Sequence, residues 1–253
     1  MNQQKISKRI SERWDAINLL DECILKHHRP TCLICGRRGK RLHFEILEAE
    51  CVFQGGRLER YKCPDCGCVF GPRKVLELHS AVLAQDYQDL YSIYSEADST
   101  ESEIRAFRLM EPRKGGVYLN YGSGGWSRSV AMLQEEGFRV FACDPFYKGS
   151  HPNMIPMKGL EKFRFDGIYS NNVIEHFVTP VSEFAFMRSL LKRGGVMSHA
   201  SPCYDYLYEF TRFHVIFYTG RSVETLARKL RLRVENRERD GEFICKLFKK
   251  SWW

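Results

Sequence analysis

Two sets of residues in this sequence have types and spacings suited to chemistry, and the first consists of cysteines. The segments Cys32-Leu33-Ile34-Cys35-Gly36 and Cys63-Pro64-Asp65-Cys66-Gly67 share the pattern C-x-x-C-G. This pattern is typical of a sharp turn that points two thiolates at one spot, and two such turns complete a tetrahedral zinc site. Four thiolates leave no open coordination position, so we expect a structural Zn²⁺ held by Cys32, Cys35, Cys63 and Cys66.

Neighbouring cysteines offer alternatives to this ligand set. Cys68 would replace Cys66 in a slipped register, and Cys51 lies in the hairpin that HFEILEAECVF and RLERYKC predict between the two motifs. Neither belongs to a second C-x-x-C pair. A redox role of the thioredoxin kind is disfavoured because no strand is expected before Cys32 and no helix after it.

The second set combines a glycine-rich turn with an acidic residue. In Gly122-Ser123-Gly124-Gly125 the glycines tolerate positive φ and leave bare backbone that a ligand can approach. The helix start that follows presents free N–H groups to polar ligand atoms. Asp144 comes about 20 residues later, where a carboxylate can accept both hydroxyls of a ribose. Together these residues predict a nucleoside cofactor, whereas the plainer alternative is an ordinary turn.

The elements that must position these residues are a strand, a helix and a second strand. Val117 to Tyr121 has strand spacing, an apolar stripe then indicates a helix that ends at Gly137, and Val140 to Cys143 is a second strand stopped by Asp144-Pro145. Such a crossover unit is typical of a parallel sheet covered by helices.

The identity of residue 127 decides between two cofactor classes. A dinucleotide fingerprint needs glycine there, but the residue is Ser127. The sequence instead resembles the class I S-adenosylmethionine-dependent methyltransferases, whose first motif is a strand, an acid, any residue and G-x-G. Asn120 stands in place of the acid and brings no charge to the cofactor's ammonium. The resemblance implies that Asn120, Tyr121, Gly122 and Gly124 hold the methionine side, and Asp144 the ribose.

A second stretch carries the same resemblance. Phe165 to Phe177, FDGIYSNNVIEHF, matches the family's f-D-x-I-x-s-n-x-V-l-E-H pattern, and LLKRGGV then matches the turn into the fifth strand, with Arg193 where proline is commoner. The resemblance implies ligand contacts from Asn171 and Asn172 at the strand end, and from Pro145 and Phe146 beside the adenine. It covers about Ser102 to Lys249.

Two histidines are candidates for a general base. A histidine can remove a proton from a substrate hydroxyl near neutral pH. His176 closes the E-H pair, where the alternative role is to fix its loop. His214 lies in the stretch where relatives build the acceptor pocket, and the same two roles apply to it.

The expected fold class is α/β, a doubly wound Rossmann-like methyltransferase sheet preceded by a small helix and zinc-ribbon module. The expected domains are an amphipathic helix in 1–30, the zinc ribbon in 31–73, a helical lid or linker in 74–101 with Tyr87, Tyr91 and Tyr94, and the S-adenosylmethionine-binding domain in 102–253. Arg231 to Glu235 and Phe243 to Phe248 would close the sheet as an antiparallel hairpin. The helix stripe of Ile10, Trp14, Ile17, Leu20 and Ile24 packs on the ribbon or forms a homodimer.

Composition narrows the class of protein and its partners. The 253 residues are 43% hydrophobic with formal charge +8, and no apolar run reaches the roughly 18 residues of a membrane span. The start MNQQKISKRISER lacks a signal-peptide core, so we expect a cytoplasmic protein. The basic excess favours anionic partners such as nucleic acid or nucleotide-linked sugars, although it is scattered in short runs.

The acceptor is inferred from the resemblance alone. A ribbon fused to this domain looks like bacterial methyltransferases of sugars and surface polysaccharides, which implies O-methylation of a glycan or of a free or nucleotide-linked sugar. Tyr204, Tyr206, Tyr208 and Phe210 suit stacking on a sugar. One alternative is an RNA methyltransferase that binds RNA through the ribbon. The other is a ribbon-based interaction module on a catalytically weak domain.

Overall fold

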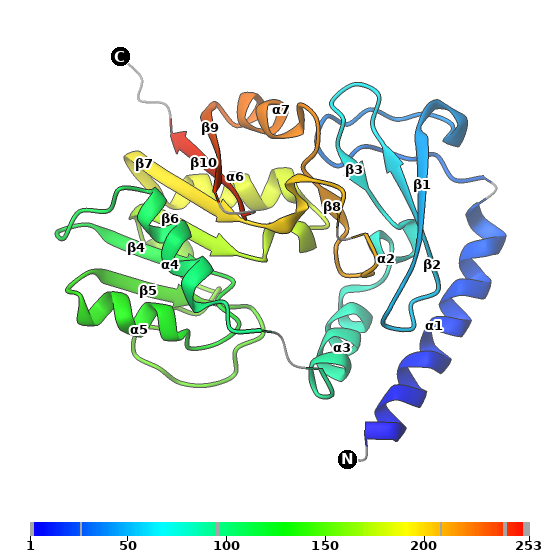
Figure 1. The fold of residues 1–253 in the computed structure, drawn as a ribbon, viewed down its shortest axis with the longest axis horizontal. Helices are drawn as coiled ribbons and strands as arrows, with labels where there is room; N and C mark the ends of the chain where they lie inside the picture. Colours follow the sequence, from blue (N-terminus) through cyan, green and yellow to red (C-terminus); the bar gives the residue numbers. More distant parts are fainter. Residues whose placement is uncertain (1–2, 26, 95–96, 208, 240–241, 250–253) are drawn as a thin grey trace. The chain divides into compact units, whose positions relative to one another are not determined.

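The computed structural model describes residues 3–25, 27–94, 97–207, 209–239 and 242–249 of the chain. These residues form two compact units (Figure 1). Unit 1 consists of Met1–Ala97 and Cys203–Ser222, and unit 2 consists of Asp98–Pro202 and Val223–Trp253. No helix among the described residues has both the length and the apolar character needed to cross a bilayer.

Unit 1 is built on a 4-stranded antiparallel sheet with the order β1-β2-β3-β8. Its strands are β1 (Glu45–Glu50), β2 (Arg57–Lys62), β3 (Val69–Phe70) and β8 (Ile216–Phe217). The expected hairpin is β1 and β2, paired in the register Ile46↔Tyr61. The unit also holds α1 (Gln3–Leu25), the 3-10 turn η1 (Arg41–His43), α2 (Arg73–Leu76) and α3 (Ser80–Tyr91). The 3-10 turn η4 (Pro202–Tyr204) begins at its boundary.

The N-terminal helix buries only the first half of its expected stripe. Ile10 and Trp14 are fully buried, but Leu20 and Ile24 are 64% and 49% exposed. Beyond Trp14 the packed side of the helix is polar, because the buried Asp21 carboxylate accepts a hydrogen bond from the Arg73 guanidinium. The period of apolar residues therefore located the helix but not the full length of its buried face.

The segment 203–222 lies in unit 1, although the expected domain limits placed it in 102–253 with the methyltransferase sheet. The reason is pairing over a long sequence distance. β8 in this segment adds to the ribbon sheet beside β3, with Phe70 opposite Ile216. The buried Arg60 guanidinium of β2 also donates to the carbonyls of Glu209, Thr211 and His214.

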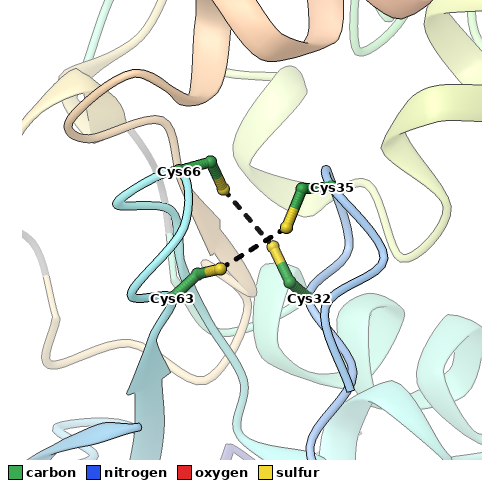
Figure 2. Close-up of side chains that lie close together, drawn as sticks. All are labelled: Cys32, Cys35, Cys63 and Cys66. Atoms are coloured by element: carbon green, nitrogen blue, oxygen red, sulfur yellow. Dashed lines mark hydrogen bonds between the residues drawn. The ribbon is translucent and has the colours of Figure 1, made fainter.

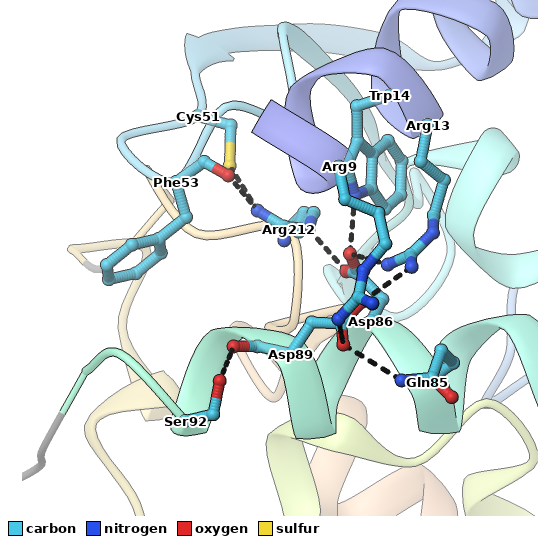
Figure 3. A network of polar contacts seen from close by, with 10 residues as sticks. All are labelled: Arg9, Arg13, Trp14, Cys51, Phe53, Gln85, Asp86, Asp89, Ser92 and Arg212. Carbon is cyan, nitrogen blue, oxygen red and sulfur yellow. Dashed lines mark hydrogen bonds and ion pairs between the residues drawn. The ribbon is translucent and has the colours of Figure 1, made fainter. Parts of the chain in front are cut away.

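A buried ion network ties α1 and α3 to the same segment (Figure 3). Asp86 and Arg212 have no exposed side-chain surface, and Arg212 Nε donates to Asp86 Oδ2 over 2.8 Å. Asp86 Oδ1 accepts from Trp14 Nε1 and Arg13 Nη1, each over 2.9 Å. Although burial opposes it, hydrogen bonds from Arg13 and other donors lower the pKa of Asp89, the second carboxylate of the network.

The expected helical lid or linker in 74–101 contains the end of α2 and all of α3, and the helical structure breaks between them before His79 caps α3. The imidazole Nδ1 of His79 accepts the backbone N–H of Ala81 over 3.2 Å, so this side chain caps the start of α3. The Tyr87 ring packs on Tyr91 and on Phe213 within unit 1. A lid role for this segment stays a prediction.

Unit 2 contains the expected doubly wound sheet, of 6 strands in the order β5-β4-β6-β7-β10-β9. The parallel strands are β4 (Val117–Tyr121), β5 (Arg139–Cys143), β6 (Phe165–Asn171) and β7 (Leu191–Ala200). β9 (Leu232–Arg239) and β10 (Glu242–Lys249) form the predicted antiparallel hairpin at the edge beside β7. The prediction of fold class is confirmed.

Helices cover both faces of this sheet (Figure 1). One face carries α4 (Thr100–Leu109) and α5 (Arg128–Glu135), whose Phe107, Val130 and Leu133 form a core with Tyr118 and Tyr169. The other face carries α6 (Pro180–Leu190), where Phe184 packs on His199 of β7. α7 (Ser222–Lys229) and the short turns η2 (Leu160–Lys162) and η3 (Ile174–His176) complete the described helices.

Candidate functional site

The four predicted metal ligands meet at one point in unit 1 (Figure 2). Sγ of Cys32 lies 3.6 Å from that of Cys66, and Sγ of Cys35 lies 3.5 Å from that of Cys63. All four sulfurs are within 4.8 Å of one another. Zinc–sulfur bonds of about 2.3 Å in a tetrahedron place the sulfurs about 3.8 Å apart, and a disulfide places them about 2 Å apart. The cluster therefore has the dimensions of a zinc site rather than of two disulfides.

The backbone around the cluster has the turn geometry that the two motifs predict. Gly36 and Gly67 have φ values of 84° and 79°, and each donates its N–H to the carbonyl of the first cysteine of its motif. The Arg37 N–H points at Cys35 Sγ over 3.4 Å. Although burial opposes it, this hydrogen bond helps to lower the pKa of the Cys35 thiol, which favours the thiolate that a metal needs. Cys68 lies outside the four-sulfur cluster, and its Sγ contacts the Val69 carbonyl over 3.7 Å.

The glycine turn of unit 2 follows β4 directly. Gly122, Gly124 and Gly125 all have positive φ, at 76°, 66° and 134°, which side-chain-bearing residues rarely adopt. The N–H groups of Gly122 and Ser123 both donate to the Cys143 carbonyl at the end of β5. A Cβ at Gly122 would collide with Val173, whereas a Cβ at Gly124 would meet nothing within 4 Å. Gly124 therefore offers open backbone that a ligand can approach.

Asp144 braces this turn. Its Oδ2 accepts the Gly124 N–H over 2.9 Å, and its Oδ1 accepts the Phe146 N–H over 2.8 Å. An ionised carboxylate has about four acceptor sites, so about two remain for ligand hydroxyls. The strand-tip carboxylate and the open glycine backbone thus lie side by side, as a nucleoside site requires.

The other predicted cofactor residues differ in what they can offer. The Tyr121 hydroxyl donates to Glu183 Oε2 of α6 over 3.2 Å, so this side chain faces away from the layer of α4 and α5. Burial raises the pKa of Tyr121 and keeps it protonated. Pro145 and Phe146 are exposed, with the Phe146 ring at 48%. Asn171 ends β6, and Asn172 follows with φ of 53°.

Asn120 is buried on the sheet face that carries α4, and its Nδ2 donates to Glu103 Oε2 over 2.8 Å. Sequence reasoning did not single out Glu103. A signal existed, because Glu103 falls on the apolar stripe of α4 that includes Ala106, Phe107 and Met110. A charged residue on a buried stripe indicates a polar partner inside the fold.

A second missed contact is the stack of Trp126 on His151. Their ring centroids lie 3.5 Å apart with planes inclined by 20°. His151 belongs to the connection between β5 and β6, which also adds a parallel bridge between Ala142 and Met154 at the sheet edge. The indole thereby anchors this connection next to the glycine turn. Neither residue belongs to a motif, so no local feature of the sequence indicated the stack.

The two candidate bases lie in different units. His176 ends η3 after β6, and the neighbouring buried Glu175 accepts a hydrogen bond from Ser201 Oγ over 3.0 Å within unit 2. His214 is in unit 1, where its Nδ1 lies 3.4 Å from Cys203 Sγ. A catalytic role for either histidine stays a prediction.

Comparison with known proteins shows which family contains this site. Residues 99–247 match a family model described as a methyltransferase domain, and no curated protein matches the chain. A Burkholderia thailandensis 1,6-didemethyltoxoflavin-N1-methyltransferase structure with bound 1,6-didemethyltoxoflavin and S-adenosylhomocysteine is 17% identical, with TM-score 0.51 over 77% of this chain and 96% of that chain.

Two further solved structures are similar at a lower level. An O-methyltransferase family protein from Burkholderia thailandensis is 10% identical, with TM-score 0.45 over 68% of this chain and 61% of that one. An S-adenosylmethionine-dependent methyltransferase from Mesorhizobium loti is 15% identical, with TM-score 0.43 over 57% of this chain and 96% of that one. The family match spans more than half of the sequence, so the chain belongs to this methyltransferase family, as its resemblance to the class I enzymes led us to expect.

Proposed function

We propose that this protein transfers a methyl group from S-adenosylmethionine to an oxygen of a sugar or glycan in surface polysaccharide synthesis. The observation that carries the donor assignment is the pairing of Asp144 with the open backbone of Gly124. Asp144 holds the ribose hydroxyls, and Gly122 and Gly124 lie against the methionine side. The structural relative with bound S-adenosylhomocysteine supports this choice of cofactor.

The main contribution of this chain to the reaction is to align the methyl donor with the acceptor. S-adenosylmethionine, when bound, supplies an electrophilic methyl group on a sulfonium. Displacement of the sulfur by the acceptor oxygen would need the two ligands in line, so this chain would lower the barrier by holding them at the right distance and angle. The hydroxyl proton passes to a base, for which His176 and His214 are the candidates. Asn171 and Asn172, at the carboxyl end of β6, face the acceptor side of the cofactor.

The zinc site has a structural role in this proposal. Four cysteine ligands leave no position for water or substrate, so the metal would contribute to folding and not to the chemistry. Thiolate ligands persist in a reducing compartment, which fits a location in the cytoplasm. The exposed Leu20 and Ile24 on α1 are where a homodimer contact would form.

Aromatic side chains of the segment 203–222 support a sugar acceptor. The Phe210 ring is 40% exposed, as stacking on a sugar face requires, whereas Tyr206 packs on Phe217 with ring centroids 4.9 Å apart. The ring centroids of Tyr204 and Tyr218 lie 6.0 Å apart. Tyr208, predicted to act with them, lies outside the described residues. RNA is the second acceptor class, favoured by the charge of +8.

Calorimetry separates the enzyme proposal from a pure interaction module. S-adenosylhomocysteine should bind the purified chain at one site, and an absence of binding heat would remove both enzyme hypotheses. A radiolabelled methyl donor is then offered with nucleotide-linked sugars, polysaccharide fragments and RNA in parallel. Label recovered as an O-methyl group on a sugar supports the proposal. Label in RNA, together with RNA affinity that falls steeply with salt, would replace it with the RNA alternative.

A further inference from the structure

The buried carboxylate of Glu103 accepts a hydrogen bond from Asn120, the residue in the position of the family's acid. Glu103 on α4 is 7% exposed. Its Oε2 accepts from Asn120 Nδ2 over 2.8 Å, from Ser127 Oγ over 2.6 Å and from Ser129 Oγ. Its Oε1 accepts from Ser99 Oγ over 2.8 Å. The residue before α4, the end of β4 and the start of α5 thus all contribute hydrogen bonds to this one group.

Among the residues that the structure describes, Glu103 is surrounded by neutral hydrogen-bond donors. No arginine, lysine or histidine in the described parts of the chain forms an ion pair with it. Burying an ionised carboxylate without an opposite charge is costly unless hydrogen bonds compensate, and here four neutral donors supply them. Hydroxyl and carboxamide donors stabilise the ionised form and leave the negative charge in place. The site therefore holds one net negative charge beneath the glycine turn.

The hydrogen bond to Glu103 also fixes which way the Asn120 carboxamide faces. The oxygen and nitrogen of such a group are normally assigned from their partners. An ionised carboxylate only accepts hydrogen bonds, so the group that faces Glu103 is the NH₂ end. The carboxamide oxygen is then the end of Asn120 that is turned away from the Glu103 carboxylate. An amide held this way passes the polarity of the carboxylate to its far end.

We propose that Glu103 is a positioning residue that restores, from α4, the negative charge that Asn120 lacks. Through the carboxamide of Asn120 it presents an acceptor oxygen to the ammonium group of the cofactor's amino-acid portion. This inference rests on the proposed binding of S-adenosylmethionine. It assigns recognition of the amino-acid portion to Glu103 and Asn120 together, whereas Asp144 recognises the ribose independently.

The test compares two ligands that differ in the amino-acid portion. S-adenosylhomocysteine carries the ammonium group, and 5′-methylthioadenosine keeps the adenosine and sulfur but lacks the amino-acid portion. Glu103→Gln should weaken S-adenosylhomocysteine about tenfold in calorimetry, which corresponds to ~1.4 kcal/mol, and leave 5′-methylthioadenosine within twofold. A structural role alone would weaken both ligands equally. Equal loss, or no loss for either ligand, overturns the inference.

Exchanging the two groups gives a second test that does not depend on the single variant's folding. In the double variant Glu103→Gln/Asn120→Asp the carboxamide and the carboxylate trade places and keep their hydrogen bond. S-adenosylhomocysteine affinity should return to within threefold of wild type. Asn120→Asp alone places two carboxylates in contact, so its thermal midpoint should fall. A double variant whose S-adenosylhomocysteine affinity stays more than threefold below that of the wild type refutes the charge argument.

Asp166→Asn is the matched control. Asp166 is a partly buried acid of the same unit, and it accepts the Val117 N–H at the opposite, amino end of the parallel strands. Its loss should change the affinity of neither ligand, and a tenfold loss for S-adenosylhomocysteine would overturn the specific role of Glu103. If the wild type binds neither ligand, the proposed function itself fails and this inference falls with it. If the wild type binds both and Glu103→Gln leaves their ratio unchanged, only the inference fails.

Discussion

The buried pair of Asp86 and Arg212 allows a stability prediction for unit 1. Asp86→Asn keeps the shape of the side chain but removes the charge that faces Arg212, whose side chain is fully buried. Removing one partner of a buried ion pair typically costs ~3–5 kcal/mol, because the other charge is left uncompensated. Arg13 is 16% exposed and keeps Asp89 as a partner, and the new carboxamide retains an acceptor oxygen. We therefore expect the lower end of this range, so that Asp86→Asn reduces the free energy of unfolding by about 3 kcal/mol.

Urea unfolding followed by tryptophan fluorescence measures this loss. Trp14 is fully buried and donates to Asp86, so its emission reports on the network directly. The background Trp126→Phe/Trp252→Phe/Trp253→Phe leaves it as the single indole of the chain. Such a probe follows unit 1 even if the two units unfold in separate transitions.

An exposed ion pair on the same helix provides the control. Lys8 and Glu12 lie 3.6 Å apart with side chains 77% and 66% exposed. Glu12→Gln should change the stability by less than about 0.5 kcal/mol, because water screens such pairs. If Asp86→Asn costs no more than this control, the reasoning about the buried network is refuted.

Three further outcomes are expected. Cys63→Ser should lower the zinc content measured by mass spectrometry from one ion per chain to none, whereas Cys68→Ser should leave it unchanged; a Cys63→Ser chain that keeps its zinc contradicts the ligand set. Asp144→Ala should weaken S-adenosylhomocysteine about 10- to 100-fold in calorimetry through lost charged hydrogen bonds, and a change below about threefold would mean that the ribose lies elsewhere. Burial lowers the pKa of His199 to about 3 from 6.5, so the unfolded chain binds the extra proton and stability should fall as the pH drops from 6.5 towards 3. His199→Gln should flatten that dependence in urea titrations at several pH values, and an unchanged slope would exclude His199 as its source.

The sequence predicted most of unit 2 because its signals are local. Glycines with positive φ, an acid at a strand tip and alternating apolar strands each depend on a few adjacent residues, and all appear where expected. The same holds for the cysteine turns, since each C-x-x-C-G motif dictates its own backbone geometry. The four sulfurs meet because the hairpin between the motifs forms as the alternation of residues indicated.

What the sequence did not predict depends on contacts between distant residues. Arg60 bonds carbonyls about 150 positions away, and neither partner carries a local sign of this. Glu103 reaches Asn120 only because α4 packs on the sheet face where that side chain points. Leu20 and Ile24 continue an apolar period, but the surface beside them is polar, so tertiary packing overrode the pattern.

Because unit 1 takes its last strand from residues 216–217, it is discontinuous in the chain. A ribosome that has released only the first 100 residues has delivered both cysteine motifs but not β8, nor the carbonyls that satisfy Arg60. The metal can therefore bind early, while the sheet edge at β3 waits until nearly the whole of the chain has emerged. A fragment cut near residue 97 would keep its four sulfurs, but its strand β3 would lack the partner β8 and its Arg60 guanidinium would lack the carbonyls that accept from it. Such a fragment should aggregate rather than fold as an independent ribbon.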